Sequence, residues 1–182
     1  ALQTTLKAPA TLPAASDPAS AILLVSGAGV SAEITGLTIS GPGPTGCGSI
    51  AYGIFVRDGA NANIHDNRVL DVRDQPFSGC QNGVAIQVGR QSLGTTGTAT
   101  ITGNTISGYQ KNGITVSNAG SSAVITGNTV TGAGPTTVIA QNGIQVSGGA
   151  VGTITGNTIS GHSYTPASYV STGMLLYYAN AS

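Results

Sequence analysis

Charged side chains are scarce in this chain. Six of its 182 residues are acidic and six are basic, so the formal net charge at pH 7 is zero. A chain without excess positive charge has no general electrostatic attraction to nucleic acid or to an anionic membrane surface. We therefore expect no nucleic-acid partner.

Long apolar runs and familiar catalytic motifs are also missing. The longest apolar run, residues 21–25, is far too short to cross a bilayer, so no membrane span is expected. The sequence has no phosphate-binding Gly-Lys pattern, no zinc-type spacing of Cys and His, and no nucleophile elbow. On this basis we expect no metal and no cofactor.

Helical periodicity is hard to find, whereas glycine is abundant. The 28 glycines follow no strict three-residue period, and many Ser, Thr, Val and Ile residues accompany them. This composition is typical of short strands joined by tight corners, and it argues against collagen or disorder.

One eight-residue unit recurs along the chain. Ile-Thr-Gly-Asn-Thr-Ile-Ser-Gly occupies residues 101–108 and 154–161, and a close variant occupies residues 125–132. Looser copies begin at Ile34 and Ile64. Self-similarity of this kind indicates a chain built from stacked copies of one structural unit.

A second repeat, of the Asn-Gly-Ile kind, alternates with the first. Its glycines fall at constant steps of 30 residues, at Gly53, Gly83, Gly113, Gly143 and Gly173. Together the two repeats predict a single domain over residues 1–182 with coils at about 1–31, 32–60, 61–97, 98–120, 121–150 and 151–182. Each coil buries a thin apolar layer, which only stacking at a strand spacing of roughly 4.8 Å covers.

The repeated asparagines are predicted to form two ladders along the axis. Stacked amides can hydrogen-bond to the coils above and below, and repetition in several coils favours a structural role. Glycine beside each asparagine suits a corner that needs positive φ. The first ladder is expected to contain Asn67, Asn104, Asn128 and Asn157, and the second Asn82, Asn112 and Asn142.

These repeats resemble those of right-handed parallel β-helix proteins, which include pectate-lyase-like proteins and periplasmic copper-enzyme maturation proteins. The resemblance covers nearly the whole chain and implies an all-β fold, a right-handed parallel β-helix of about six coils. It does not decide function, because β-helices of this type include lyases, hydrolases, epimerases, adhesins and inert stalks.

Two cysteines lie in the connections of consecutive coils. Stacking brings Cys47 and Cys80 side by side, so they are either disulfide-bonded or half-buried free thiols. We expect the disulfide, which contributes about 3–4 kcal/mol for a loop of this size. Ala1 is compatible with cleavage by a signal peptidase, and we expect a secreted or extracellular protein.

Seven of the twelve acidic and basic residues, together with His65, fall within residues 57–74, mostly in the coil at 61–97, the second repeat coil. By the family resemblance this cluster implies an alternative function, a polysaccharide lyase, hydrolase or epimerase, with polysaccharide as partner. Arg68 or Arg73 is then the base and His65 the acid. Asp66, Asp71 and Asp74 are then acids or Ca²⁺ ligands. The alternating signs favour instead a self-neutralising surface network.

Outward threonine columns give a third reading, an ice-binding face. His65 and Arg68 interrupt these columns, so β-propensity and solubility explain the threonines better.

Neither end of the chain shows a capping helix. Prolines interrupt any helical pattern in residues 1–20, and residues 174–178 are expected to form a final strand. Exposed terminal coils favour a head-to-tail contact with another copy, which does not close and therefore propagates into a filament or stalk. The alternative is a longer protein whose caps lie outside this sequence. The expected contact residues are Leu2, Leu6, Leu23, Val25, Met174, Leu176, Tyr177 and Tyr178. We predict this structural role, without catalysis, as the main function.

Overall fold

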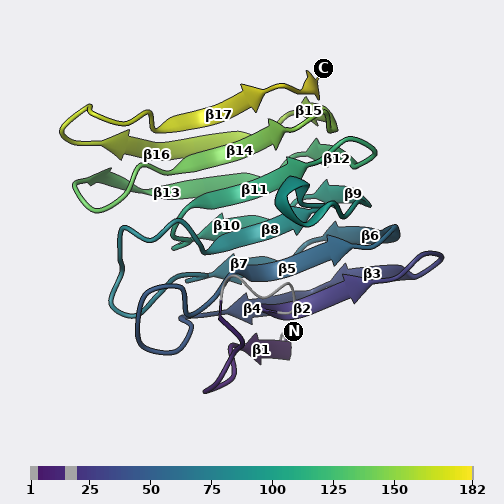
Figure 1. The fold of residues 1–182 in the computed structure, drawn as a ribbon, viewed down its shortest axis with the longest axis horizontal. Coiled ribbons are helices and arrows are strands. Elements are labelled where there is room, and N and C mark those ends of the chain that lie inside the picture. The colour runs from purple at the N-terminus through teal and green to yellow at the C-terminus, as the bar shows by residue number, and fades with distance from the viewer. Residues whose placement is uncertain (1–3, 15–19, 182) are drawn as a thin grey trace.

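The protein folds into three parallel β-sheets that wind together into a solenoid. The computed structural model describes residues 4–14 and 20–181. Each sheet contains six strands, and the chain passes from the first sheet to the second and the third in every turn. Figure 1 shows the six turns stacked from the N-terminus to the C-terminus. The predicted all-β parallel β-helix of about six coils is confirmed.

The strands are short, as the repeats predict. Sheet A contains β1 (Thr4–Lys7), β4 (Leu37–Ser40), β7 (Arg68–Leu70), β10 (Thr105–Ser107), β13 (Thr129–Thr136) and β16 (Thr158–Tyr164). Sheet B contains β2 (Ala21–Ser26), β5 (Tyr52–Arg57), β8 (Val84–Val88), β11 (Asn112–Ser117), β14 (Asn142–Ser147) and β17 (Thr172–Tyr177). Sheet C contains β3 (Ser31–Thr35), β6 (Ala60–His65), β9 (Gly97–Thr102), β12 (Ser122–Thr126), β15 (Val151–Thr155) and β18 (Asn180–Ala181). A 3₁₀ turn, η1 (Gln91–Leu93), follows β8.

The core consists of aliphatic columns that run along the solenoid axis. In sheet B, Ile86, Ile114 and Ile144 stack in register and are fully buried. In sheet C, Ile64, Ile101 and Ile125 form an equivalent column. Each fully buried isoleucine contributes about 1.5–3 kcal/mol relative to an exposed one, so stacking of the coils supplies most of the stability.

The first asparagine ladder runs along the corner between sheets C and A. The backbone N–H and side-chain Nδ2 of Asn67 both donate to Oδ1 of Asn104, at 3.0 Å each. Asn104 makes the same pair of bonds to Asn128, and Asn128 to Asn157. Each Nδ2 also donates to an isoleucine carbonyl of the preceding coil, so the amides bind neighbouring coils in both directions.

The second ladder differs from the prediction because one coil is out of register. Val84 pairs with both Tyr52 and Asn112, so Ala85 occupies the position that the constant 30-residue step assigned to Gly83. Asn82 therefore precedes the strand and lies outside this ladder. The remaining members, Asn112, Asn142 and Thr172, are linked through their side chains at 3.2 and 3.0 Å.

The glycines of the two repeats serve different purposes. Gly103 has φ +65° at the corner, as expected beside a ladder asparagine. Gly113 does not have positive φ; a Cβ there would lie 2.6 Å from the Gly143 carbonyl oxygen and 2.5 Å from Val130 Cγ1. The prediction of positive φ is thus wrong for Gly113, where close packing between coils excludes a side chain.

Candidate functional site

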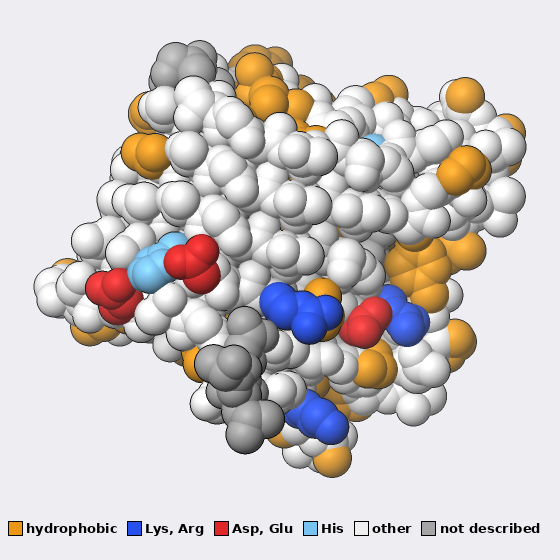
Figure 2. Space-filling view, turned by 180° about the vertical axis from the view of Figure 1, so that it is seen from behind, with side chains coloured by type: hydrophobic (Ala, Val, Ile, Leu, Met, Phe, Trp, Pro, Cys, Tyr) orange, Lys and Arg blue, Asp and Glu red, His pale blue; other side chains and the backbone are white. Residues whose placement is uncertain are grey.

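The charged residues of the second repeat coil form separate groups. His65 lies between two carboxylates, with Nε2 2.8 Å from Glu33 and Nδ1 2.9 Å from Asp66. The hydrogen bonds to Asp66 and then Glu33 raise the pKa of His65. Figure 2 views the molecule from behind and shows charged side chains in a band low on this face, with an almost uncharged surface above them.

Asp66 and Asp71 have a backbone role at the corners. Their φ values are 55° and 54°, close to the 65° and 69° of Gly103 and Gly108 at the equivalent positions. Aspartate is one of the few residues that tolerates this left-handed conformation. Asp71 also pairs with Arg73 at 3.4 Å, whereas Arg68 lies exposed on β7. The corner geometry therefore gives both aspartates a structural role.

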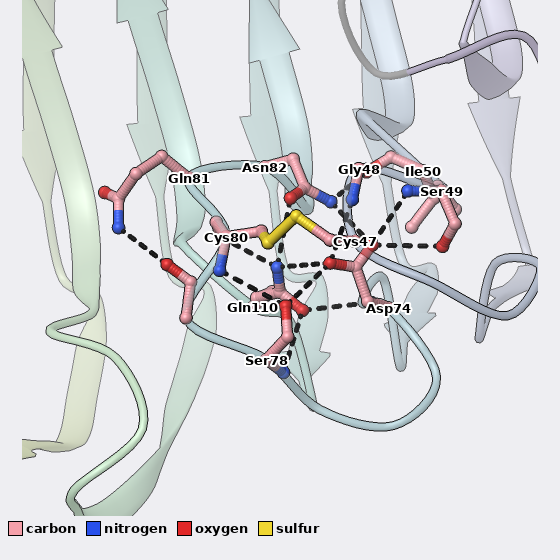
Figure 3. The surroundings of a disulfide bond; sticks show 11 residues. Cys47, Gly48, Ser49, Ile50, Asp74, Ser78, Cys80, Gln81, Asn82 and Gln110 are labelled. Carbon is pink, nitrogen blue, oxygen red and sulfur yellow. Dashed lines mark hydrogen bonds between the residues drawn. A yellow bond between two sulfur atoms is a disulfide. The ribbon is translucent and has the colours of Figure 1, made fainter.

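Asp74, which the enzyme alternative assigned as an acid or Ca²⁺ ligand, is fully buried. Its carboxylate accepts hydrogen bonds from the two connections that the disulfide joins and from the next coil (Figure 3). The donors are Gly48 N, Ser49 N, Ser49 Oγ, Ser78 Oγ, Asn82 Nδ2 and Gln110 Nε2. Burial raises the pKa of Asp74, but these bonds outweigh burial and the pKa lies below its ordinary value.

The predicted disulfide is present beside Asp74. Cys47 and Cys80 are bonded, with their Cα atoms 5.9 Å apart, and the bond joins the connections that precede β5 and β8. In the described part of the chain, the one group of three potential metal ligands is Cys47, Asp74 and Cys80. Its two sulfurs are bonded to each other, so neither is available as a thiolate. Asp66, Asp71 and Asp74 do not converge on a Ca²⁺ site.

A polar groove lies over the outer face of sheet B, and sequence reasoning missed it. Its volume is about 380 Å³. Gln87, Thr115 and Gln145 lie in register across β8, β11 and β14 and form part of its lining, together with Tyr177 of the last coil. Amides, hydroxyls and aromatic rings in a concave site suit a hydroxyl-rich ligand such as a sugar chain.

Two cations line this groove without a carboxylate. The Arg90 guanidinium lies 5.7 Å from the centre of the Tyr52 ring and donates to the Tyr52 hydroxyl. Lys111 Nζ donates to the Ala140 carbonyl at 2.8 Å, and burial lowers the pKa of Lys111. No acidic residue is among the described residues that line the groove. The available sequence signals were Arg90 in an unusually long coil and Lys111 in a nearly uncharged one.

The last coil exposes the apolar column that the other coils bury. Met174 and Leu176 continue the sheet B columns of Ile144 and Val146. Ile144 and Val146 are fully buried, whereas Met174 and Leu176 are 43% and 51% exposed. Tyr177 and Tyr178 beside them are 60% and 78% exposed.

The first coil is more covered than the sequence predicted. Val25 is only 5% exposed, and Leu6 and Leu23 are half-buried. Ala8 and Leu12, which follow β1, pack against the same apolar cluster. The expectation that Val25 is open for contact is therefore wrong. Leu2 lies outside the described residues.

The fold defines a parallel β-helix. A family model described as a right-handed β-helix region matches residues 85–182, more than half of the chain. The chain therefore belongs to the right-handed β-helix family, as its repeats suggested. Comparisons with curated proteins and with solved structures found no match. No helix in the described residues is long and apolar enough to cross a membrane.

Proposed function

We propose that this β-helix is an extracellular structural solenoid that associates head to tail with other copies of itself. The observation that carries the proposal is the exposure of Met174 and Leu176, whose counterparts one coil earlier are fully buried. An exposed apolar layer between unpaired strand edges is the surface that such a solenoid covers by adding a further coil.

The strand arrangement suits this contact. Every sheet has six strands, with β1, β2 and β3 at one edge and β16, β17 and β18 at the other. A second copy placed on the last coil can therefore continue all three sheets in the same order. Such a contact joins two different surfaces and repeats without closing, so it produces a filament. The Cys47–Cys80 disulfide supports an oxidising, extracellular setting.

The test measures association of the 182-residue chain by light scattering after size-exclusion chromatography. We expect the average mass to rise with concentration. Leu176→Lys should abolish the rise, because a charge in the contact layer has no partner. Val124→Lys is the matched control on a side face, since Val124 is 45% exposed. A constant monomer mass, or equal effects of the two substitutions, would contradict the proposal.

The groove over sheet B favours a second function, binding of an acidic polysaccharide. Hydroxyls and amides suit sugar hydroxyls, while Arg90 and Lys111 suit a carboxylate. In calorimetric titrations we expect tetragalacturonate to bind and neutral maltotetraose not to bind. Arg90→Met and Lys111→Met should each weaken binding, whereas Arg68→Met, on the exposed face of β7, should not. Equal binding of both sugars would count against this function.

A further inference from the structure

A second hollow adjoins the groove, and a larger share of its lining residues are apolar or aromatic. Its volume is about 470 Å³, and its lining is largely apolar, with Val138, Ile139, Tyr164, Tyr169 and Val170 among its members. Val138 precedes β14, and the other exposed members lie between β16 and β17. The hollow therefore lies at the connections between sheets A and B.

Three of the apolar residues that line the hollow are exposed to solvent. Tyr169 and Val170 are 71% and 75% exposed, and Val138 is 41% exposed. The Tyr164 and Tyr169 rings lie 5.9 Å apart, centre to centre, and present a tilted aromatic pair. Contiguous exposed apolar side chains of this kind mark binding surfaces more often than single exposed residues do.

The two hollows meet at Gln81 and Lys111, which line both. The Lys111 ammonium makes a hydrogen bond to the Ala140 carbonyl and no ion pair with any described residue. Burial lowers the pKa of Lys111, so an anion at this junction would stabilise its charged form. Lys111 thus lies where the groove meets the hollow.

We propose that the groove and the hollow form one site for an amphiphile with a carboxylated sugar head and an apolar tail, as in an acidic glycolipid. The head lies in the groove between Arg90 and Lys111, and the tail lies against Tyr164, Tyr169 and Val170. This inference rests on the sugar-binding function proposed for the groove, and it adds a tail subsite and a lipid-linked class of ligand.

The test uses dodecyl glucuronide below its micelle concentration, titrated into the full chain by calorimetry. We expect it to bind about ten-fold or more tightly than glucuronate, which lacks the tail, or dodecyl glucoside, which lacks the charge. Tyr169→Ser should weaken dodecyl glucuronide binding and leave tetragalacturonate binding unchanged. Lys111→Met should weaken both. Val124→Ser, at an exposed apolar side chain of β12 that lines neither hollow, is the control.

The outcomes separate this inference from the function on which it rests. Equal affinities for glucuronate and dodecyl glucuronide, with tetragalacturonate still bound, would overturn the tail subsite alone. Equal affinities for dodecyl glucoside and dodecyl glucuronide would overturn the role of Lys111 as anchor, and with it the acidic head. If the protein binds neither tetragalacturonate nor dodecyl glucuronide, both proposals are wrong.

Discussion

Asparagine at the corner between sheets C and A acts as a connector between coils. Asn104 is 1% exposed, accepts two hydrogen bonds from Asn67, and donates to the Ile64 carbonyl and to Asn128. A buried amide with every group paired favours one stacking register over its alternatives. The ladder therefore helps to fix the order of the coils as well as their stability.

Asn104→Ala should lower the free energy of unfolding by about 3 kcal/mol, since it leaves buried donors of Asn67 and the Ile64 carbonyl without partners. Asn157→Ala, at the partly exposed end of the ladder, should cost clearly less. Urea unfolding of both variants checks this. Equal losses would mean that position along the ladder does not matter.

The two histidines have opposite environments. His162 is half-buried, its Nε2 interacts with the Tyr109 hydroxyl, and its buried Nδ1 has no hydrogen-bond partner among the described residues. Burial lowers the pKa of His162. His65 is exposed to solvent between two carboxylates, and its pKa is raised.

These shifts predict pH dependences of opposite sign. Because burial places the folded pKa of His162 below its unfolded value of about 6.5, its contribution is complete above about 6.5 and is lost as the pH falls through the folded pKa. The contribution of His65 is complete below about 6.5 and is lost as the pH rises through its raised folded pKa. Melting temperatures from about pH 5 to pH 8 test this. His162→Gln should reduce the loss of stability that accompanies a fall in pH. His65→Gln should destabilise the protein more at low pH than at high pH. A melting temperature whose dependence on pH is unchanged by either substitution would refute these predictions.

Sequence repeats predict sheets A and C better than sheet B. In sheets A and C, the Ile-Thr-Gly-Asn-Thr units pair in the expected register from β9 to β15 and from β10 to β16. In sheet B, two extra residues before β8 place Ala85 instead of Gly83 in the glycine column. A constant spacing of 30 residues hid this shift, because the compensating shortening lies in the brief connection between β10 and β11, which more than offsets the longer connection that carries η1 and Arg90.

Gly113→Ala should destabilise the β-helix by about 2–3 kcal/mol, because the added Cβ meets the Gly143 carbonyl and Val130. Gly127→Asn is the informative comparison. Gly127 has φ +66° and no neighbour within 4 Å of an added Cβ, and asparagine tolerates this conformation. Its denaturation midpoint should therefore change little. A larger loss for Gly127→Asn would reverse this account of the two glycines.

The disulfide and the hydrogen bonds of Asp74 hold together connections that lie outside the regular strands. Cys47 and Cys80 are 33 residues apart, so their bond should contribute about 4 kcal/mol through the entropy of the unfolded chain. We expect Cys47→Ser/Cys80→Ser to lower the free energy of unfolding by that amount while the parallel sheets persist in circular dichroism. A loss below about 1 kcal/mol would show that the Asp74 hydrogen bonds alone hold these connections.

At the scale of the molecule, repetition made the fold predictable and left the candidate sites largely unpredictable. The charged residues from His65 to Asp74 are close in sequence, but corners and burial assign them separate structural roles. The groove joins side chains from β5, β8, β11, β14 and β17, which no local motif connects. Its two cations, Arg90 and Lys111, are 21 residues apart in sequence and line the same groove only because successive coils stack.

The open last coil gives the central claim its most direct test, negative-stain electron microscopy of the unsubstituted 182-residue chain across a range of concentrations. Six turns at about 4.8 Å correspond to about 29 Å for each copy. Head-to-tail association predicts rods of constant width whose lengths increase in steps of about that size. Particles of one unchanging length at every concentration, whether monomers or closed dimers, would contradict it.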